Sequence, residues 1–269
     1  MKNKLSKIFR RKNKILIGAI HLPPLLGYPE YPGLKTALKN ALADLQNLEK
    51  GGVDGVIFEN NYDIPHKIFV EPPTAILMAL IGQELRKATR LPLGVSFLWN
   101  DYKTALTLAK TLGLQFIRVP VFVDKVKTRY GIIEGSPKSV LDFRRSVHAE
   151  NVALLTDIHV KHAELLSKSS LVASAKLAIK NQSDALIVTG RWTGEAPDLE
   201  KLKILKKSVG NFSILVGSGV DEKNIGVLSR YSNGAIVGTS LKKGGKQHGE
   251  INVKAYSQRI DLRRVKKIV

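Results

Sequence analysis

The stretch from Leu155 to His162 places several chemically active side chains at the end of an apolar run. Within it, Asp157, His159 and Lys161 supply a carboxylate, an imidazole and an amine. Alternate side chains of an extended strand share one face, so Asp157 and His159 are predicted to point into the same space. Such a pair could give one carboxylate and one imidazole to a metal, or form a histidine base oriented by an acid.

Two more charged residues follow other apolar runs and could complete this site. Glu59 would join Asp157 as a second carboxylate, for proton transfer or for a hard cation such as Mg²⁺; metal and no metal are equally favoured. Arg118 and Lys161 would balance the charge of an anionic substrate, while a buried Lys161 could instead form a Schiff base. The predicted catalytic residues are therefore Glu59, Arg118, Asp157, His159 and Lys161, with no cofactor assigned with certainty.

Eight short apolar runs alternate with segments of helical periodicity, as expected for buried parallel strands and their crossover helices. The predicted strands cover residues 15–20, 53–58, 93–97, 114–119, 152–158, 185–189, 212–216 and 235–237. The predicted helices cover residues 35–50, 72–89, 102–112, 138–149, 169–181, 198–209, 221–231 and 253–266. This order predicts an α/β protein with a single (β/α)8 TIM barrel over residues 15–269 and a basic N-terminal extension over residues 1–14.

Active sites of such barrels lie at the carboxyl ends of the strands. The residues predicted there as substrate-binding are His21, Asn60, Asn100, Asp101, Thr193 and Gly194. Strands seven and eight end in small residues whose backbone N–H groups could hold phosphate, although plain turns are the alternative. These residues are Gly217, Ser218, Gly219, Gly238, Thr239 and Ser240. The polar connection 122–137 could act as a lid, and no role is predicted for His66, His148, His162 and His248.

Composition limits the classes of function. The chain has 269 residues and no cysteine, which excludes disulfides, thiolate catalysis and cysteine-bound zinc. Its formal net charge is +20, with basic runs near both ends. The N-terminal run is predicted to be a solvated extension, with contact to nucleic acid or membrane, or organelle targeting, as less favoured alternatives. No apolar run reaches the ~20 residues of a membrane helix, so a cytoplasmic protein is predicted. The predicted partner is a phosphorylated small molecule, and a homo-oligomer is left open.

A set of short motifs completes the sequence pattern. They are His21-Leu22-Pro23-Pro24, Gly52-Val53-Asp54-Gly55-Val56-Ile57 with Glu59-Asn60, Leu91-Pro92-Leu93-Gly94-Val95, Phe116-Ile117-Arg118-Val119, Asp157-Ile158-His159-Val160-Lys161-His162-Ala163, Asp184-Ala185-Leu186-Ile187-Val188, Thr193-Gly194, Asp198-Leu199, Leu215-Val216-Gly217-Ser218-Gly219-Val220 and Ile236-Val237-Gly238-Thr239-Ser240-Leu241-Lys242. Together they resemble the BtpA/SgcQ family over about residues 15–242.

The resemblance implies a TIM barrel of the phosphate-binding kind. The family is named for a photosystem I biogenesis factor and for barrel enzymes assigned to sugar catabolism. Trp99 stands where the family often has Arg, Pro120 where Asn is common, and Arg191-Trp192 fill a loop that is usually small. These departures bear on substrate specificity and activity.

Two hypotheses of function follow. The first is an enzyme of isomerase, lyase or hydrolase type that acts on a small phosphorylated metabolite, such as a sugar or nucleoside phosphate. The alternative is a non-catalytic assembly or stability factor for a membrane complex such as photosystem I, which would use the basic ends to touch its partner.

Overall fold

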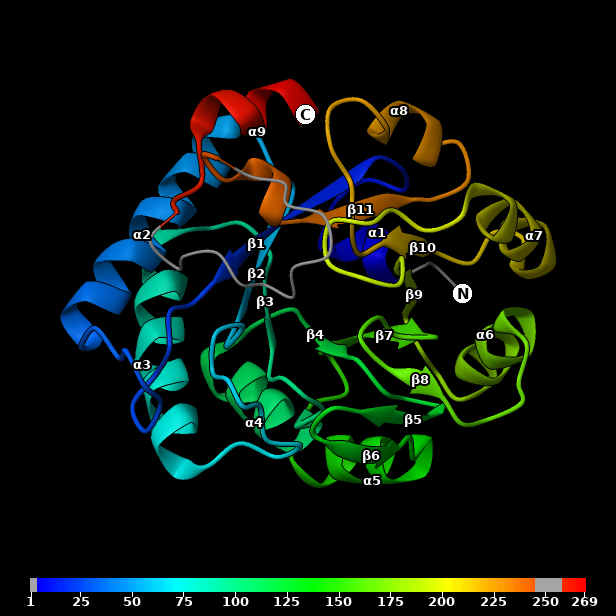
Figure 1. The fold of residues 1–269 in the computed structure, drawn as a ribbon, viewed down its shortest axis with the longest axis horizontal. Coiled ribbons are helices and arrows are strands. Elements are labelled where there is room, and N and C mark those ends of the chain that lie inside the picture. The colour runs from blue at the N-terminus through cyan, green and yellow to red at the C-terminus, as the bar shows by residue number, and fades with distance from the viewer. Residues whose placement is uncertain (1–3, 245–257) are drawn as a thin grey trace.

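A computed structural model describes residues 4–244 and 258–269 of the chain. Eight parallel strands close into a barrel in the order β1-β11-β10-β9-β7-β4-β3-β2, which confirms the predicted architecture (Figure 1). The strands are β1 (Ile15–His21), β2 (Gly55–Glu59), β3 (Leu93–Ser96), β4 (Phe116–Val119), β7 (Ala153–Ile158), β9 (Ala185–Val188), β10 (Ile214–Val216) and β11 (Gly234–Val237). Each lies within or beside a predicted apolar run.

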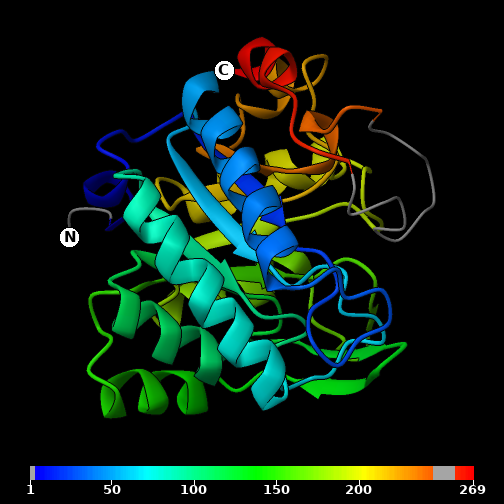
Figure 2. The same cartoon turned by 90° about the vertical axis from the view of Figure 1, so that its left-hand side faces the viewer.

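Helices surround the barrel, and α2, α3, α4 and α5 lie side by side across one flank (Figure 2). The outer helices are α2 (Leu34–Gly51), α3 (Pro72–Ala88), α4 (Tyr102–Leu112), α5 (Pro137–Ser146), α6 (Leu171–Lys180), α7 (Leu199–Val209), α8 (Ile225–Leu228) and α9 (Leu262–Ile268). Asp198 caps α7 as predicted, because its side chain accepts a hydrogen bond from the Lys201 N–H. Helix α8 is shorter than predicted, and the predicted start of the last helix lies outside the described residues.

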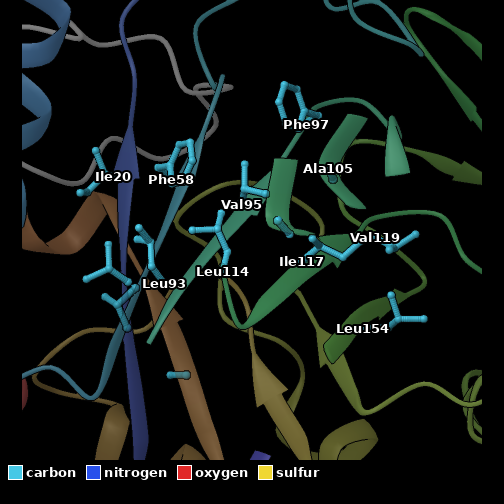
Figure 3. Close-up of a cluster of buried hydrophobic side chains, with 14 of the residues drawn as sticks. Ile20, Phe58, Leu93, Val95, Phe97, Ala105, Leu114, Ile117, Val119 and Leu154 are labelled. Carbon is cyan, nitrogen blue, oxygen red and sulfur yellow. The ribbon is translucent and has the colours of Figure 1, made fainter. Parts of the chain in front are cut away.

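Alternation along the strands divides the apolar core into two layers. Outward-facing residues such as Ile20, Phe58 and Leu154 pack under the helices (Figure 3). Inward-facing residues such as Ile57 and Leu155 fill the barrel interior. The barrel interior is therefore a packed core, and a ligand site is expected at its rim.

The N-terminal segment belongs to this inner layer. Helix α1 (Lys4–Ile8) lies against the amino ends of the strands, where Leu5 and Phe9 are 0% and 6% exposed. Phe9 packs on Phe116 with ring centroids 5.6 Å apart. Gly55 leaves space for it, since a Cβ there would lie 2.6 Å from the Phe9 ring. The prediction of a solvated extension is wrong for these residues, because two apolar side chains among the lysines close the barrel.

The connection 122–137 is folded and not irregular. It forms the hairpin of β5 (Lys125–Thr128) and β6 (Gly131–Glu134), and β8 (Glu164–Leu165) extends it to a three-stranded antiparallel sheet. Buried Val126 and Ile133 join the hairpin to the rim of the barrel. Among residues 4–244 and 258–269, no helix is both long and apolar enough to cross a bilayer.

Candidate functional site

A cavity of about 290 Å³ opens at the carboxyl ends of the barrel strands. Its lining includes His21 at the end of β1, Glu59 at the end of β2 and Arg118 in β4. Lys161 enters from the loop after β7. Side chains far apart in the sequence meet here because parallel strands bring all their carboxyl ends to one rim.

Arg118 connects the two carboxylates of the site. Its Nε and Nη2 donate to the two carboxylate oxygens of Asp157, both at 2.8 Å, and its Nη1 donates to Glu59 Oε1 at 3.2 Å. All three side chains are buried. Burial alone lowers the pKa of Arg118, but the charges and hydrogen bonds of Asp157 and Glu59 outweigh it and raise the pKa overall. Arg118 is therefore a permanent cation that fixes both carboxylates.

Asp157 lies behind this cation and does not line the cavity. Burial raises the pKa of Asp157, and the Arg118 charge acts in the opposite direction. Its two oxygens bind the same guanidinium, the geometry in which arginine holds a carboxylate most firmly. The predicted role of Asp157 in orienting His159 is wrong, because its hydrogen bonds go to Arg118.

His21 is a neutral imidazole beside Glu59. Its Nε2 lies 4.0 Å from Glu59 Oε2. Burial, followed by the charges of Lys242, Lys161 and Arg118, lowers the pKa of His21 well below its usual range. Gly238 makes this position possible, since a Cβ there would lie 2.8 Å from the imidazole Nε2. A neutral ring can accept or donate a hydrogen bond without adding charge to the site.

Lys161 is held by two threonines from the next βα loop. Its backbone N–H donates to Thr189 Oγ1 and its Nζ donates to Thr193 Oγ1, both at 3.1 Å. Burial, followed by repulsion from Arg118, lowers the pKa of Lys161 to about 8. Neutral amine is therefore present near neutral pH.

His162 shares the same threonine, with its Nε2 2.8 Å from Thr193 Oγ1. Burial lowers the pKa of His162 to about 3, so the ring is neutral. Thr193 and Gly194, both predicted to bind substrate, line the cavity beside it.

His159 lies outside this cavity. Strand β7 ends at Ile158, and His159 adopts a left-handed backbone with φ of 51° that breaks the alternation. Its N–H donates to Asp124 Oδ2 at 3.0 Å, and its Nε2 lies 3.4 Å from Ser174 Oγ. The ring lines a second hollow between the loops that follow β7 and β9. The prediction that His159 shares a space with Asp157 is therefore wrong.

Three predicted substrate-binding residues hold loops instead and do not line the cavity. Asn60 pairs with both backbone groups of Leu98, and Asn100 pairs with both backbone groups of Val121. The side chain of Asp101 caps α4. Polar residues at strand ends are predicted to face a ligand, but here the backbone of the neighbouring loop satisfies them.

The six residues predicted to bind phosphate all line the cavity: Gly217, Ser218, Gly219, Gly238, Thr239 and Ser240. The serine hydroxyls secure neighbouring loops. Ser218 Oγ accepts from the Gly190 N–H and donates to the Glu195 carbonyl, each at 2.8 Å. Ser240 Oγ donates to the Val220 carbonyl at 2.6 Å. These hydrogen bonds therefore hold the loops after β10 and β11 in place around the cavity.

Aromatic side chains form much of the remaining wall; the sequence singled out only Trp99 and Trp192, as departures from the family pattern, and gave no role to the other three. They are His66, Trp99, Tyr130, His162 and Trp192. His66 stacks edge-on with Tyr130, with ring centroids 5.3 Å apart. Burial lowers the pKa of His66 to about 4. Tyr130 comes from the β5–β6 turn, which no local pattern places over the barrel. His148 is exposed, and His248 lies outside the described residues.

No group of three or more His, Asp or Glu side chains in the described part of the chain could hold a metal ion. The two carboxylates nearest the cavity both contact Arg118. The cavity lining thus combines two arginines, buried Arg118 and exposed Arg129, with one lysine, one carboxylate and neutral imidazoles.

Comparison with known proteins identifies the family. The family model described as BtpA family matches residues 12–269. The chain belongs to the BtpA family. The photosystem I biogenesis protein BtpA of Synechocystis sp. is 37% identical over 251 residues, which cover 92% of this chain and 85% of that protein. An uncharacterized protein of Pyrococcus horikoshii is 36% identical over 90% of this chain and 92% of its own length.

Solved structures with this fold are more distant. N-(5'-phosphoribosyl)anthranilate isomerase from Pyrococcus furiosus has a TM-score of 0.57 and 11% identity, covering 95% of this chain and 96% of that chain. A structure described as native KDPGal has a TM-score of 0.55 and 12% identity, covering 94% of this chain and 91% of that chain. At these identities, the likeness shows that the BtpA-family chain has a TIM-barrel fold.

Proposed function

We propose that this BtpA-family protein is an enzyme that acts on a small phosphorylated metabolite, a sugar or nucleoside phosphate, as an isomerase, lyase or hydrolase. The observation that supports it is one cavity whose lining contains two unlike groups. These are the small residues after β10 and β11, and the charged residues Glu59, Arg118 and Lys161.

The β10 and β11 loops suit a phosphate group. Thr239 and Ser240 open the short 3-10 helix η1 (Thr239–Leu241), and the first N–H groups of a helix have no partner within it. Glycines beside them allow close approach of a ligand to the backbone. Lys161 and Arg118 add positive charge to the same cavity. The isomerase of a phosphoribosyl compound among the solved structures with this fold also favours a phosphorylated ligand.

The charged residues suit proton transfer. Glu59 Oε1 binds Arg118, while Oε2 faces the neutral imidazole of His21. A carboxylate fixed on one oxygen can exchange a proton through the other. Lys161 would stabilise negative charge that develops on the substrate. Glu59 is thus the proposed acid or base, with Arg118 as its positioning residue.

Ligand-dependent thermal unfolding tests the proposal. Inorganic phosphate and a set of sugar and nucleoside phosphates would be compared with their unphosphorylated forms. A ligand at ten times its Kd stabilises the native state by about 1.4 kcal/mol, or roughly 3–6 °C for a chain of this size. Stabilisation by phosphorylated compounds alone is expected, and equal effects of both forms would contradict the phosphate site.

Thr239→Asp provides the specific variant, because a carboxylate at η1 would repel phosphate. It should weaken phosphate binding by at least about tenfold. Thr239→Asn is the matched control, because asparagine has nearly the same shape as aspartate but no charge. This variant should keep most of the affinity for phosphate. Equal loss in both variants would show that shape and not charge matters at this position.

The second candidate is a non-catalytic assembly factor for a membrane complex, favoured by the name of the Synechocystis relative. Deleting residues 1–14 does not test it, because Leu5 and Phe9 close the barrel. Reversing the charge of exposed Lys7, Arg10 and Lys12 leaves both apolar residues in place. Rescue of cells that lack the protein separates the two: an assembly factor tolerates Glu59→Gln and fails on charge reversal, and an enzyme does the opposite.

A further inference from the structure

We infer that Lys161 is a nucleophile that forms an imine with the carbonyl carbon of a phosphorylated aldehyde or ketone. This rests on the proposed function and narrows its substrate class to carbonyl compounds. The alternative for the same residue is a permanent ammonium ion that only balances substrate charge.

The position of the amine supports the nucleophilic role. Lys161 lines the cavity that also contains Glu59 and the β10 and β11 loops. Its backbone N–H is anchored to Thr189 and its Nζ to Thr193 Oγ1. Both ends of a flexible side chain are therefore held, and the amine is bound to a threonine that lines the same cavity.

The partners of the amine are neutral. Within residues 4–244 and 258–269, no carboxylate oxygen lies within 4 Å of Lys161 Nζ, although two carboxylates are nearby. Glu59 and Asp157 instead bind Arg118 at 2.8–3.2 Å. A direct ion pair with a carboxylate would stabilise the charged form of a lysine. At this site the carboxylates form their ion pairs with Arg118 and not with Lys161. The lowered pKa of Lys161, about 8, agrees with this arrangement.

Thr193 holds the amine in position. Its Oγ1 accepts from Lys161 Nζ at 3.1 Å and lies 2.8 Å from His162 Nε2. Since the imidazole is neutral, Nε2 can accept the threonine proton in one tautomer. The hydroxyl then points its lone pairs toward the amine and keeps Nζ in place.

Imine formation at Lys161 is a condensation that releases one water. The neutral amine of Lys161 donates its lone pair to the carbonyl carbon, and the carbonyl π electrons move to oxygen. A proton passes from nitrogen to that oxygen and gives a carbinolamine. One further proton, taken from solvent with Glu59 as the carrier, protonates the hydroxyl, which leaves as water. Amine, carbonyl compound and one proton thus become a protonated imine and one water.

Borohydride trapping tests this step with two small phosphorylated carbonyl compounds, glycolaldehyde phosphate and dihydroxyacetone phosphate. The full-length protein is incubated with each compound near pH 8, reduced, digested and mapped by mass spectrometry. Lys242 is a built-in control, because burial also lowers its pKa to about 8, but it packs on Tyr62 outside the cavity lining. Occupancy at Lys161 should exceed that at Lys242 by about tenfold or more.

The outcomes separate the two proposals. Trapping at Lys161 that falls with excess inorganic phosphate or in Thr239→Asp supports both the imine and the phosphate site. Absence of an adduct at Lys161 with both compounds, while phosphate still stabilises the protein, overturns the imine and leaves the proposed function standing. An adduct that phosphate does not reduce supports the imine and contradicts the phosphate site. Equal labelling of Lys161 and Lys242 overturns the imine, because a low pKa alone would explain it.

Discussion

The two ends of the barrel are filled by opposite kinds of side chain. At the amino ends, Leu5 and Phe9 of the N-terminal segment pack on apolar residues of the inner layer. At the carboxyl ends, Arg118 and Asp157 take interior positions and form a buried ion pair. Burying charges costs several kcal/mol in desolvation, whereas apolar burial is favourable. The comparison indicates that one end stabilises the barrel and that the other holds charged groups at a cost in stability, as the proposed ligand site requires.

The largest effect is expected at the charged end. Arg118→Met leaves the buried carboxylates of Asp157 and Glu59 without their cation, which should lower the free energy of unfolding by about 5 kcal/mol, the upper end of the range for a broken buried pair. Urea denaturation measures it. The double variant Arg118→Met with Asp157→Leu removes both charges of the closer pair and should recover part of the loss. If the double variant is no more stable than Arg118→Met, the unpaired charge of Asp157 is not the cause of the lost stability.

The apolar end should show loss of stability without loss of binding. Phe9→Ala removes a ring that packs on Phe116. It should lower the free energy of unfolding by about 3 kcal/mol, the lower end of the range for a core phenylalanine, because Phe9 is 6% exposed. Phe9→Leu, which retains more apolar volume, should cost less. At a temperature where the variant is folded, the affinity for phosphate measured by calorimetry should match that of the wild type. A weakened affinity would contradict the separation of the two ends.

Lys161→Met should stabilise the protein at neutral pH by about 1–2 kcal/mol, because the burial cost of an ammonium ion disappears. The native pKa of Lys161, about 8, lies below the unfolded value of about 10.4, so the native state binds fewer protons between these values. The contribution of Lys161 to stability therefore rises with pH from about 8 to 10.4. The advantage of the variant over the wild type should shrink across this window.

Unfolding of both proteins in urea at pH 7 and pH 10 checks this prediction, with Lys161→Gln as a polar control of similar length. A wild type that is more stable than Lys161→Met at pH 7 would show that the ammonium ion makes a favourable ion pair.

The smallest effect is expected at His159, which contacts Asp124 and Ser174 outside the cavity. His159→Asn retains a residue that tolerates the left-handed backbone and should change stability by less than about 1 kcal/mol. Ligand-induced thermal shifts should equal those of the wild type. A loss of the ligand-induced thermal shift in this variant would show that His159 contributes to the ligand site.

The sequence predicted the eight barrel strands because buried parallel strands are continuous apolar runs with polar residues at their ends. It also predicted Glu59, Arg118 and Lys161 at one rim, since the fold brings strand ends together. It misplaced His159, because two-residue alternation holds only while the strand continues, and β7 ends one residue earlier.

The other differences depend on tertiary packing. Leu5 and Phe9 occur among lysines with no helical repeat long enough to reveal an apolar face. Asn60 and Asn100 pair with the backbone of loops that are distant in the sequence. Tyr130 reaches the cavity only because the β5–β6 hairpin folds back over the rim. Local periodicity carries no information about such contacts.

The most direct test of a phosphate-binding rim is a crystal structure of the wild-type protein soaked with inorganic phosphate, collected beside a Thr239→Asp crystal treated in the same way. The account predicts density for the anion at the backbone of Gly219, Thr239 and Ser240 in the wild type, and none there in the variant. Phosphate bound only elsewhere, or equal density at this position in both crystals, would contradict it.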